Sequence, residues 1–213
     1  MRAQPPTFRP TWVLLMSSVM LLAGGYSLVA GLLKLRDPSI VLTVGTSGSA
    51  GSEEQVQLNR QLAAARAAAV APHRQLVQIE AGFEILLALF TLYATAAVLS
   101  RDRNGRALTL AVGALGIVYQ LGTLPVYLSL MRDYAERGAD LLAQVVILSA
   151  GNQSTPDAAE VARRLRSAIV GGPIVVAVLS VSGSLVLLAF FGGRRGRALY
   201  GMDAPPPVTR PGG

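Results

Sequence analysis

Hydrophobic and polar positions divide this chain of 213 residues into four long apolar segments joined by polar connections. The apolar segments occupy residues 11–33, 81–100, 107–131 and 168–193. At a rise of about 1.5 Å per residue, each segment is long enough as a helix to cross a hydrocarbon layer about 30 Å thick. The pattern predicts an all-α integral membrane protein, built as an antiparallel bundle of four transmembrane helices.

The connection 34–80 predicts a loop followed by a helix that continues into the second span. Ser52 and Gln55 form a capping box, and small or apolar residues then recur every three or four positions into the membrane. Pro72 falls on this stripe. We expect a kink or a short break there, because proline removes one backbone hydrogen bond.

The connection 132–167 predicts a helical hairpin. The third span continues past Arg132, and a second helix leads into the fourth span. Thr155 as N-cap and Pro156 at the first helical position are typical of the start of such a helix. Together with the helix of 34–80, this hairpin predicts a small extracytoplasmic helical head.

Charge indicates which side of the membrane each connection faces. Residues 1–10, the turn 101–106 and the tail 194–213 hold nine arginines against two aspartates, which accounts for the whole net charge of +7. The other two connections, counted together with Glu84 of the second span, are neutral in sum. Because basic residues near span ends are enriched on the cytoplasmic side, we expect both termini and the turn to be cytoplasmic. The proline-rich tail is typical of a disordered segment.

The first apolar segment resembles a signal peptide in its basic flank, but it is longer than the 7 to 15 or so residues of a signal-peptide core, so we expect an uncleaved anchor. One lysine beside eighteen arginines is typical of a GC-rich bacterial genome, which indicates a bacterial inner membrane. A pI near 10.5 does not indicate nucleic-acid binding here, because the arginines flank the spans as anchors.

Chemistry-bearing patterns are few. Cysteine is absent and histidine occurs once, at His73, so disulfides, thiolate metal sites and cysteine nucleophiles are excluded. The sequence contains no catalytic motif and no metal-ligand spacing. We therefore expect a protein that is not an enzyme and that holds no cofactor.

Glu84 is a candidate functional residue, because a charged side chain inside an apolar span is costly. It lies about 25 Å from the cytoplasmic end of its helix, near the outer edge of the hydrocarbon. Glu80 is one turn away on the same face, and Lys34 and Arg132 lie at similar depth as candidate ion-pair partners. Two interpretations remain open: an ion pair at the membrane rim, or a site for a proton, an ion or a ligand.

Gln120 is the deepest polar side chain of the spans. It shares a face of the third span with Gly113 and Gly116, whose small size permits close helix packing. Depth counting places Thr91 and Ser180 at its level, which predicts a polar layer. Such a layer either joins the helices by hydrogen bonds or binds a substrate.

Two classes of function fit these observations. The first is a non-catalytic multi-pass membrane protein that acts as a subunit, scaffold or interaction module, with the lipid bilayer and other membrane subunits or copies of itself as partners. The alternative is a small transporter, channel or lipid- or ligand-binding membrane protein that uses Glu84 and Gln120. A membrane enzyme ranks third, because acids and bases within the spans are scarce.

Overall fold

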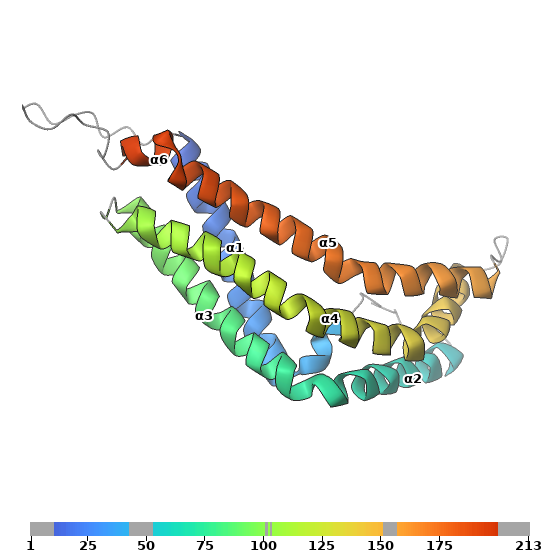
Figure 1. Ribbon diagram of the computed structural model, residues 1–213. Helices are drawn as coiled ribbons and strands as arrows, with labels where there is room; N and C mark the ends of the chain where they lie inside the picture. The colour runs from blue at the N-terminus through green and yellow to red at the C-terminus, as the bar shows by residue number, and fades with distance from the viewer. Residues whose placement is uncertain (1–10, 43–52, 101, 103, 151–156, 200–213) are drawn as a thin grey trace, which may run out of the picture.

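The computed structural model describes residues 11–42, 53–100, 102, 104–150 and 157–199, and every regular element within these ranges is helical (Figure 1). In chain order, the elements are α1 (Thr11–Arg36), the 3-10 helix η1 (Pro38–Leu42), α2 (Glu53–Val70), the 3-10 helix η2 (Ala71–His73), α3 (Arg74–Leu99), α4 (Gly105–Ala150), α5 (Ala158–Gly192) and α6 (Arg194–Leu199).

Four helical stretches are long and apolar enough to cross a membrane. They are α1, the stretch Glu53–Leu99 that holds α2, η2 and α3, the stretch Gly105–Leu148 within α4, and α5. The long helices pack into a bundle. The predicted all-helical bundle with four spans is confirmed at this level.

The bundle is made of two helix pairs. Helix α1 packs along α3, α5 packs along α4, and contacts between α3 and α4 join the pairs. At one end, Val13, Val98 and Phe191 form a buried core, and the Trp12 and Phe190 rings lie 5.7 Å apart. The start of α1, the end of α3 and the end of α5 therefore meet at the same end of the molecule (Figure 1).

Small residues bring the paired helices close together. A Cβ atom on Gly116 would lie 2.8 Å from Ser184 Oγ, and one on Gly113 would lie 3.2 Å from the Ser184 carbonyl oxygen. A Cβ on Gly31 would lie 2.7 Å from Ile85 Cγ1. The small face predicted for the third span is thus a packing seam against α5, and Gly31 makes the equivalent contact between α1 and α3.

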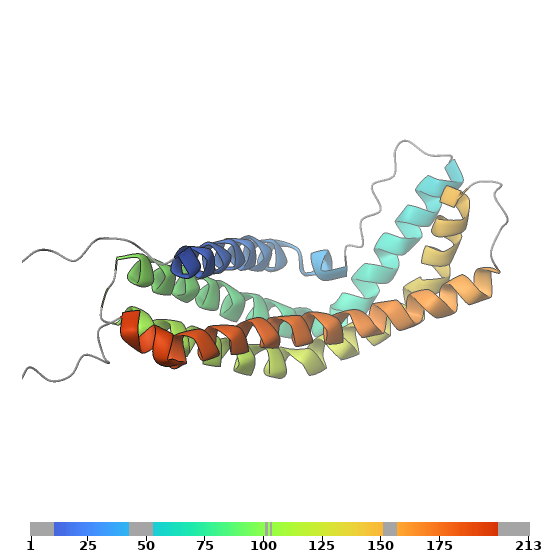
Figure 2. The same ribbon diagram turned by 90° about the horizontal axis from the view of Figure 1, so that it is seen from above.

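A short break at Pro72 is also confirmed. Proline cannot donate a backbone hydrogen bond, and the chain forms the 3-10 turn η2 between α2 and α3. His73 Nε2 lies 2.9 Å from Asp133 Oδ2, which ties this turn to α4. Beyond the turn, α2 and the last part of α4 lie side by side and bend away together from the line of α5 (Figure 2).

An apolar core fixes the contact of α2 with α4. Leu42, Leu62, Leu130 and Tyr134 are buried in it. The chain reaches this core through a turn after α1, where the Ser39 hydroxyl and N–H both donate to Asp37 Oδ1. These hydrogen bonds hold the pKa of Asp37 below its ordinary value, the hydroxyl contributing most.

Two predicted boundaries are wrong. Helix α5 begins at Ala158, with Asp157 as its N-cap, because the Asp157 carboxylate accepts a hydrogen bond from the Ala159 N–H; Thr155 and Pro156 lie outside the described residues. Residues 194–199, predicted as part of a disordered tail, form α6. The Arg197 N–H donates a backbone hydrogen bond to the carbonyl of Gly193, the residue that follows α5. Ser52 and residues 1–10 and 200–213 also lie outside the described residues.

Gly31→Ala tests the close contact of α1 with α3. The added methyl group would overlap Ile85 and the Ala81 carbonyl, so we expect the free energy of unfolding to fall by about 1 to 3 kcal/mol. Gly25→Ala is the matched control on the same helix, because nothing lies within 4 Å of its Cβ position. Thermal unfolding in detergent micelles measures both variants, and equal melting temperatures would contradict this packing.

Candidate functional site

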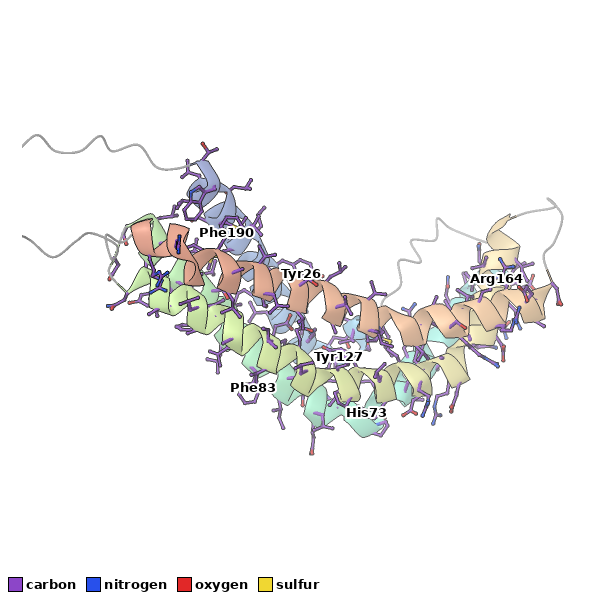
Figure 3. All side chains as sticks on the ribbon, turned by 45° about the horizontal axis from the view of Figure 1, so that its top comes forward. Tyr26, His73, Phe83, Tyr127, Arg164 and Phe190 are labelled. Carbon is purple, nitrogen blue, oxygen red and sulfur yellow. The ribbon has the colours of Figure 1, made fainter. Side chains whose placement is uncertain are left out.

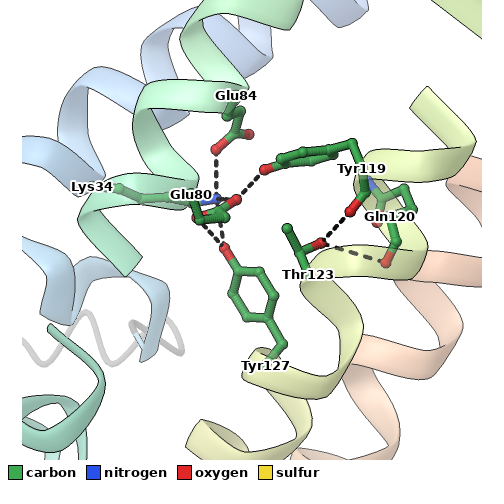
Figure 4. Close-up of polar contacts among 7 residues, drawn as sticks. All are labelled: Lys34, Glu80, Glu84, Tyr119, Gln120, Thr123 and Tyr127. Carbon is green, nitrogen blue, oxygen red and sulfur yellow. Dashed lines mark hydrogen bonds and ion pairs between the residues drawn. The ribbon is translucent and has the colours of Figure 1, made fainter. Parts of the chain in front are cut away.

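Three charged side chains from α1 and α3 meet inside the bundle (Figure 4). Lys34 Nζ lies 2.6 Å from Glu84 Oε2 and 3.2 Å from Glu80 Oε1. The exposed fractions of the Lys34, Glu80 and Glu84 side chains are 15%, 6% and 12%. Because Glu80 and Glu84 are one turn apart on α3, both carboxylates face α1 together.

Two tyrosines of α4 complete the cluster. The Tyr127 hydroxyl donates to Glu80 Oε2 at 2.9 Å and accepts from Lys34 Nζ at 2.8 Å, while the Tyr119 hydroxyl donates to Glu80 Oε1. Tyr127 lies inside the bundle, whereas Phe83, three residues from Glu80, projects outward from it (Figure 3). We call Lys34, Glu80, Glu84, Tyr119 and Tyr127 the ion cluster. It connects α1, α3 and α4.

Hydrogen bonding within the ion cluster is uneven. The three N–H groups of the Lys34 ammonium are matched by three acceptors, Glu80, Glu84 and Tyr127. Both carboxylate oxygens of Glu80 also accept hydrogen bonds. Glu84 accepts from Lys34 through Oε2, and no hydrogen bond to its Oε1 occurs within the part of the chain that the structure describes.

Two cavities adjoin the ion cluster, with volumes of about 660 Å³ and about 410 Å³. Glu84, Tyr119 and Gln120 line both of them. Their side walls come from α1 and α5, the two helices that face each other across the bundle, and α3 and α4 form the floor. We call the two cavities together the groove. Apolar residues of the side walls of the larger cavity are Val29, Ala30 and Leu33 of α1 and Ile169, Pro173 and Val176 of α5.

The groove opens to the outside of the bundle on the α1 and α5 side. Three of its lining residues have large exposed fractions: 77% for Tyr26, 57% for Val29 and 59% for Val176. All three lie in helices that are long and apolar enough to cross a membrane. A molecule dissolved in the surrounding lipid could therefore reach the groove sideways, without passing through the aqueous ends of the bundle.

The structure brings together part of the residue set predicted from sequence. Lys34, one of the two candidate partners, forms ion pairs with both Glu80 and Glu84. Arg132, the other candidate partner, is exposed, and no ion pair joins it to either glutamate among the described residues. The rim ion pair and the ligand site, the two interpretations left open, are therefore not exclusive, because the ion pair itself borders a cavity.

The predicted polar layer lines the smaller cavity. Gln120, Thr91 and Ser180 all border it. Among the described residues no hydrogen bond connects these three side chains. The Thr91 hydroxyl donates instead to the Leu87 carbonyl of its own helix. The layer thus contributes polar atoms to the groove wall and does not join the helices through hydrogen bonds.

Sequence reasoning missed the role of Tyr119. Its signal was spacing: Tyr119, Thr123 and Tyr127 follow one another at four-residue intervals and so lie near one face of α4. Gln120, next to Tyr119, is predicted from the sequence to share a packing face with Gly113 and Gly116. No pattern in the sequence indicates that the hydroxyls of both tyrosines reach a carboxylate on another helix.

The ion cluster does not have the composition of a metal centre. Within the described ranges, no group of three or more His, Cys, Asp or Glu side chains lies close enough to hold a metal ion. The lysine ammonium occupies the space between the two carboxylates. The polar atoms that line both cavities and remain for another molecule include Glu84 Oε1 and the side-chain amide of Gln120.

No protein-family model, no curated protein and no solved structure matches the chain. Its class therefore rests on its own residues. Four long apolar helices packed as a bundle, with ionisable groups enclosed between them, define a multi-pass membrane protein.

Lys34→Met tests the ion cluster. It removes the ammonium and leaves two neighbouring carboxylates enclosed without a counter-charge, so we expect the free energy of unfolding to fall by about 3 kcal/mol or more. Arg132→Met removes an exposed charge outside the cluster and should change the same quantity by less than about 0.5 kcal/mol. Both are measured by thermal or denaturant unfolding in micelles. Similar losses in the two variants would mean that the Lys34 contacts do not stabilise the protein.

Proposed function

We propose that this protein binds an amphipathic ligand from the lipid phase in the groove between α1 and α5. The observation that carries the proposal is the combination, within membrane-spanning helices, of an exposed cavity with apolar walls and an enclosed ion cluster on its floor. This is the ligand-binding alternative of the sequence analysis, in which Glu84 and Gln120 supply the polar contacts.

Size and chemistry of the groove support this proposal. Ligand-binding pockets span about 300 to 1,000 Å³, with mainly apolar walls and a few polar groups that fix orientation. The larger cavity, at about 660 Å³, falls within that range. An acyl or alkyl chain suits the walls of α1 and α5, and a polar end group suits the floor at Glu84 and Gln120.

The proposal includes an orientation in the membrane. The spans run antiparallel, with both termini and the turn 101–106 in the cytoplasm of a bacterial inner membrane, as the arginine distribution favours. Helix α2 and the adjoining ends of α4 and α5 then form an extracytoplasmic head. Lys34 is close to the head end of α1, so the ion cluster lies in the outer half of the membrane and the ligand enters from the outer leaflet.

A second candidate is a non-catalytic subunit, scaffold or interaction module, bound to other membrane proteins or to copies of itself. One observation favours it: only 11% of the apolar window of α5 is buried within the chain. A partner helix seated between α1 and α5 would cover that surface and fill the groove. Neither candidate includes a catalytic step.

Gly172→Leu tests ligand binding. Gly172 lines the larger cavity and has no atom within 4 Å of its Cβ position, so we expect a leucine there to be accepted and to reduce the space in the cavity. We expect at least tenfold weaker binding of a neutral acyl-chain probe whose fluorescence rises in apolar surroundings. The measurement is a titration of the purified protein in nanodiscs.

Gly171→Leu is the matched control for this titration. Gly171 is equally unobstructed, but it does not line the cavity. Its variant should bind the probe like the unmodified protein. If the two variants bind the probe equally well, the groove is not the binding site. If the unmodified protein captures a partner membrane protein but no probe, the second candidate is favoured.

Reporter fusions test the orientation. We expect alkaline phosphatase fused at residue 151 to be active, because the enzyme needs the oxidising exterior, and the same reporter fused at residue 104 to be inactive. A fluorescent protein that matures only in the cytoplasm should give the reverse pattern. Phosphatase activity at residue 104 would contradict the cytoplasmic placement of the turn.

A further inference from the structure

We infer that the ligand of the groove carries one positive charge on its polar end, and that this cationic group binds at Glu84 Oε1. The inference rests on the proposed function and specifies its ligand: a long-chain amphiphile with an ammonium-type head group. Charge, geometry and the environment of the ion cluster each point to it.

The ion cluster carries an excess of negative charge. Lys34 contributes one positive charge, Glu80 and Glu84 contribute two negative charges in their ionised forms, and the two tyrosines are neutral phenols. One negative charge therefore remains without a partner in the cluster. Arg132 does not compensate for it, since it is exposed and makes no ion pair with either glutamate among the described residues.

The two carboxylates of the ion cluster differ in how accessible they are to a ligand. Glu80 receives hydrogen bonds on both carboxylate oxygens, so it offers little to a ligand. Glu84 is bound by Lys34 through Oε2 only, and it lines both cavities. In the ion cluster, which carries one excess negative charge, the open hydrogen-bond acceptor therefore belongs to Glu84, which lines both cavities.

The surroundings of Glu84 are enclosed and mainly apolar. Its side chain is only 12% exposed, and the groove walls are mainly apolar, so an excess negative charge beside it is costly. A cation placed against it gains more than it would in water, because water screens the attraction poorly at such a position. Tyr119, which also lines both cavities, adds an aromatic ring of the kind that binds ammonium groups.

An anionic head group does not fit the same position. It would meet the excess negative charge of the ion cluster. The cation of the ion cluster, the Lys34 ammonium, already has three acceptors for its three N–H groups. A neutral head group would fit sterically, but it would leave the excess negative charge of the ion cluster uncompensated. The groove therefore selects a ligand by the charge of its head group at the floor, and by the length and apolarity of its chain along the walls.

The test uses the full chain in nanodiscs of zwitterionic lipid and three spin-labelled probes with the same alkyl chain: a primary amine, an alcohol and a carboxylate. Protein-free nanodiscs correct for partitioning into lipid. We expect the amine to bind at least tenfold more tightly than the alcohol, a difference of about 1.4 kcal/mol. The carboxylate should bind more weakly than the alcohol.

Three variants assign the preference to Glu84. Glu84→Gln keeps an oxygen that accepts from Lys34 but removes the charge, so the amine should bind no better than the alcohol. Glu84→Asp keeps the charge and should keep the preference for the amine. Glu136→Gln, an exposed glutamate of α4 outside the groove, should leave the affinities for all three probes unchanged.

The outcomes separate this inference from the proposed function. Equal binding of the three probes by the unmodified protein overturns the cationic ligand, and an amine preference that persists in Glu84→Gln overturns its binding at Glu84. In both cases the groove stands as a binding site. Binding of none of the probes overturns the proposed function itself. If Glu84→Gln does not fold, the head-group comparison on the unmodified chain and on Glu84→Asp still decides.

Discussion

The ion cluster is the interaction on which the rest of the structure depends. Helices in lipid gain little from the hydrophobic effect when they associate, so close packing and polar contacts must hold them. Lys34 supplies such contacts between α1 and α3, and the two tyrosines extend them to α4. Gly31, three residues before Lys34, allows the close approach of α1 to α3 that these short contacts require.

The same arrangement leaves α1 and α5 apart. Each of these helices packs against an inner partner, and α3 and α4 join the two pairs. Aromatic contacts of Trp12 with Phe190 and Phe191 bring α1 and α5 together at one end. Towards the ion cluster, the groove separates them. The groove is thus a consequence of where the small residues and the charged residues stand along the helices, and not of any separate binding domain.

Much of the fold could be predicted from the sequence because lipid imposes strong constraints. Length and apolarity are enough to predict four spans, and the missing N–H of Pro72 is enough to predict a break. Depth counting made Lys34 and Arg132 the candidate partners of Glu84, because an ionisable group in a span needs a partner at its own level. These inferences use positions along one axis, which a sequence provides directly.

The features that could not be predicted depend on how each helix is rotated about its axis and on how far apart the helices lie. A single sequence does not show either quantity directly. The polar layer was placed at the right level, yet Gln120, Thr91 and Ser180 face a cavity and not one another. Tyr119 sits on a recognisable face, but its contact with Glu80 depends on the angle between α3 and α4. The start of α5 at Asp157 and the presence of α6 are details of helix ends. Several neighbouring residues there can cap or end a helix, and sequence patterns do not distinguish well among them.

Photo-crosslinking with a long-chain alkylamine that carries a diazirine in its tail tests the central claim most directly. The unmodified protein in lipid is irradiated with the probe, and the modified residues are mapped by mass spectrometry. The account predicts labelling concentrated on groove-lining positions of both helices, such as Ala30 of α1 and Val176 of α5. Labelling spread evenly over exposed positions outside the groove, such as Leu32 and Val178, with the groove positions spared, would contradict it.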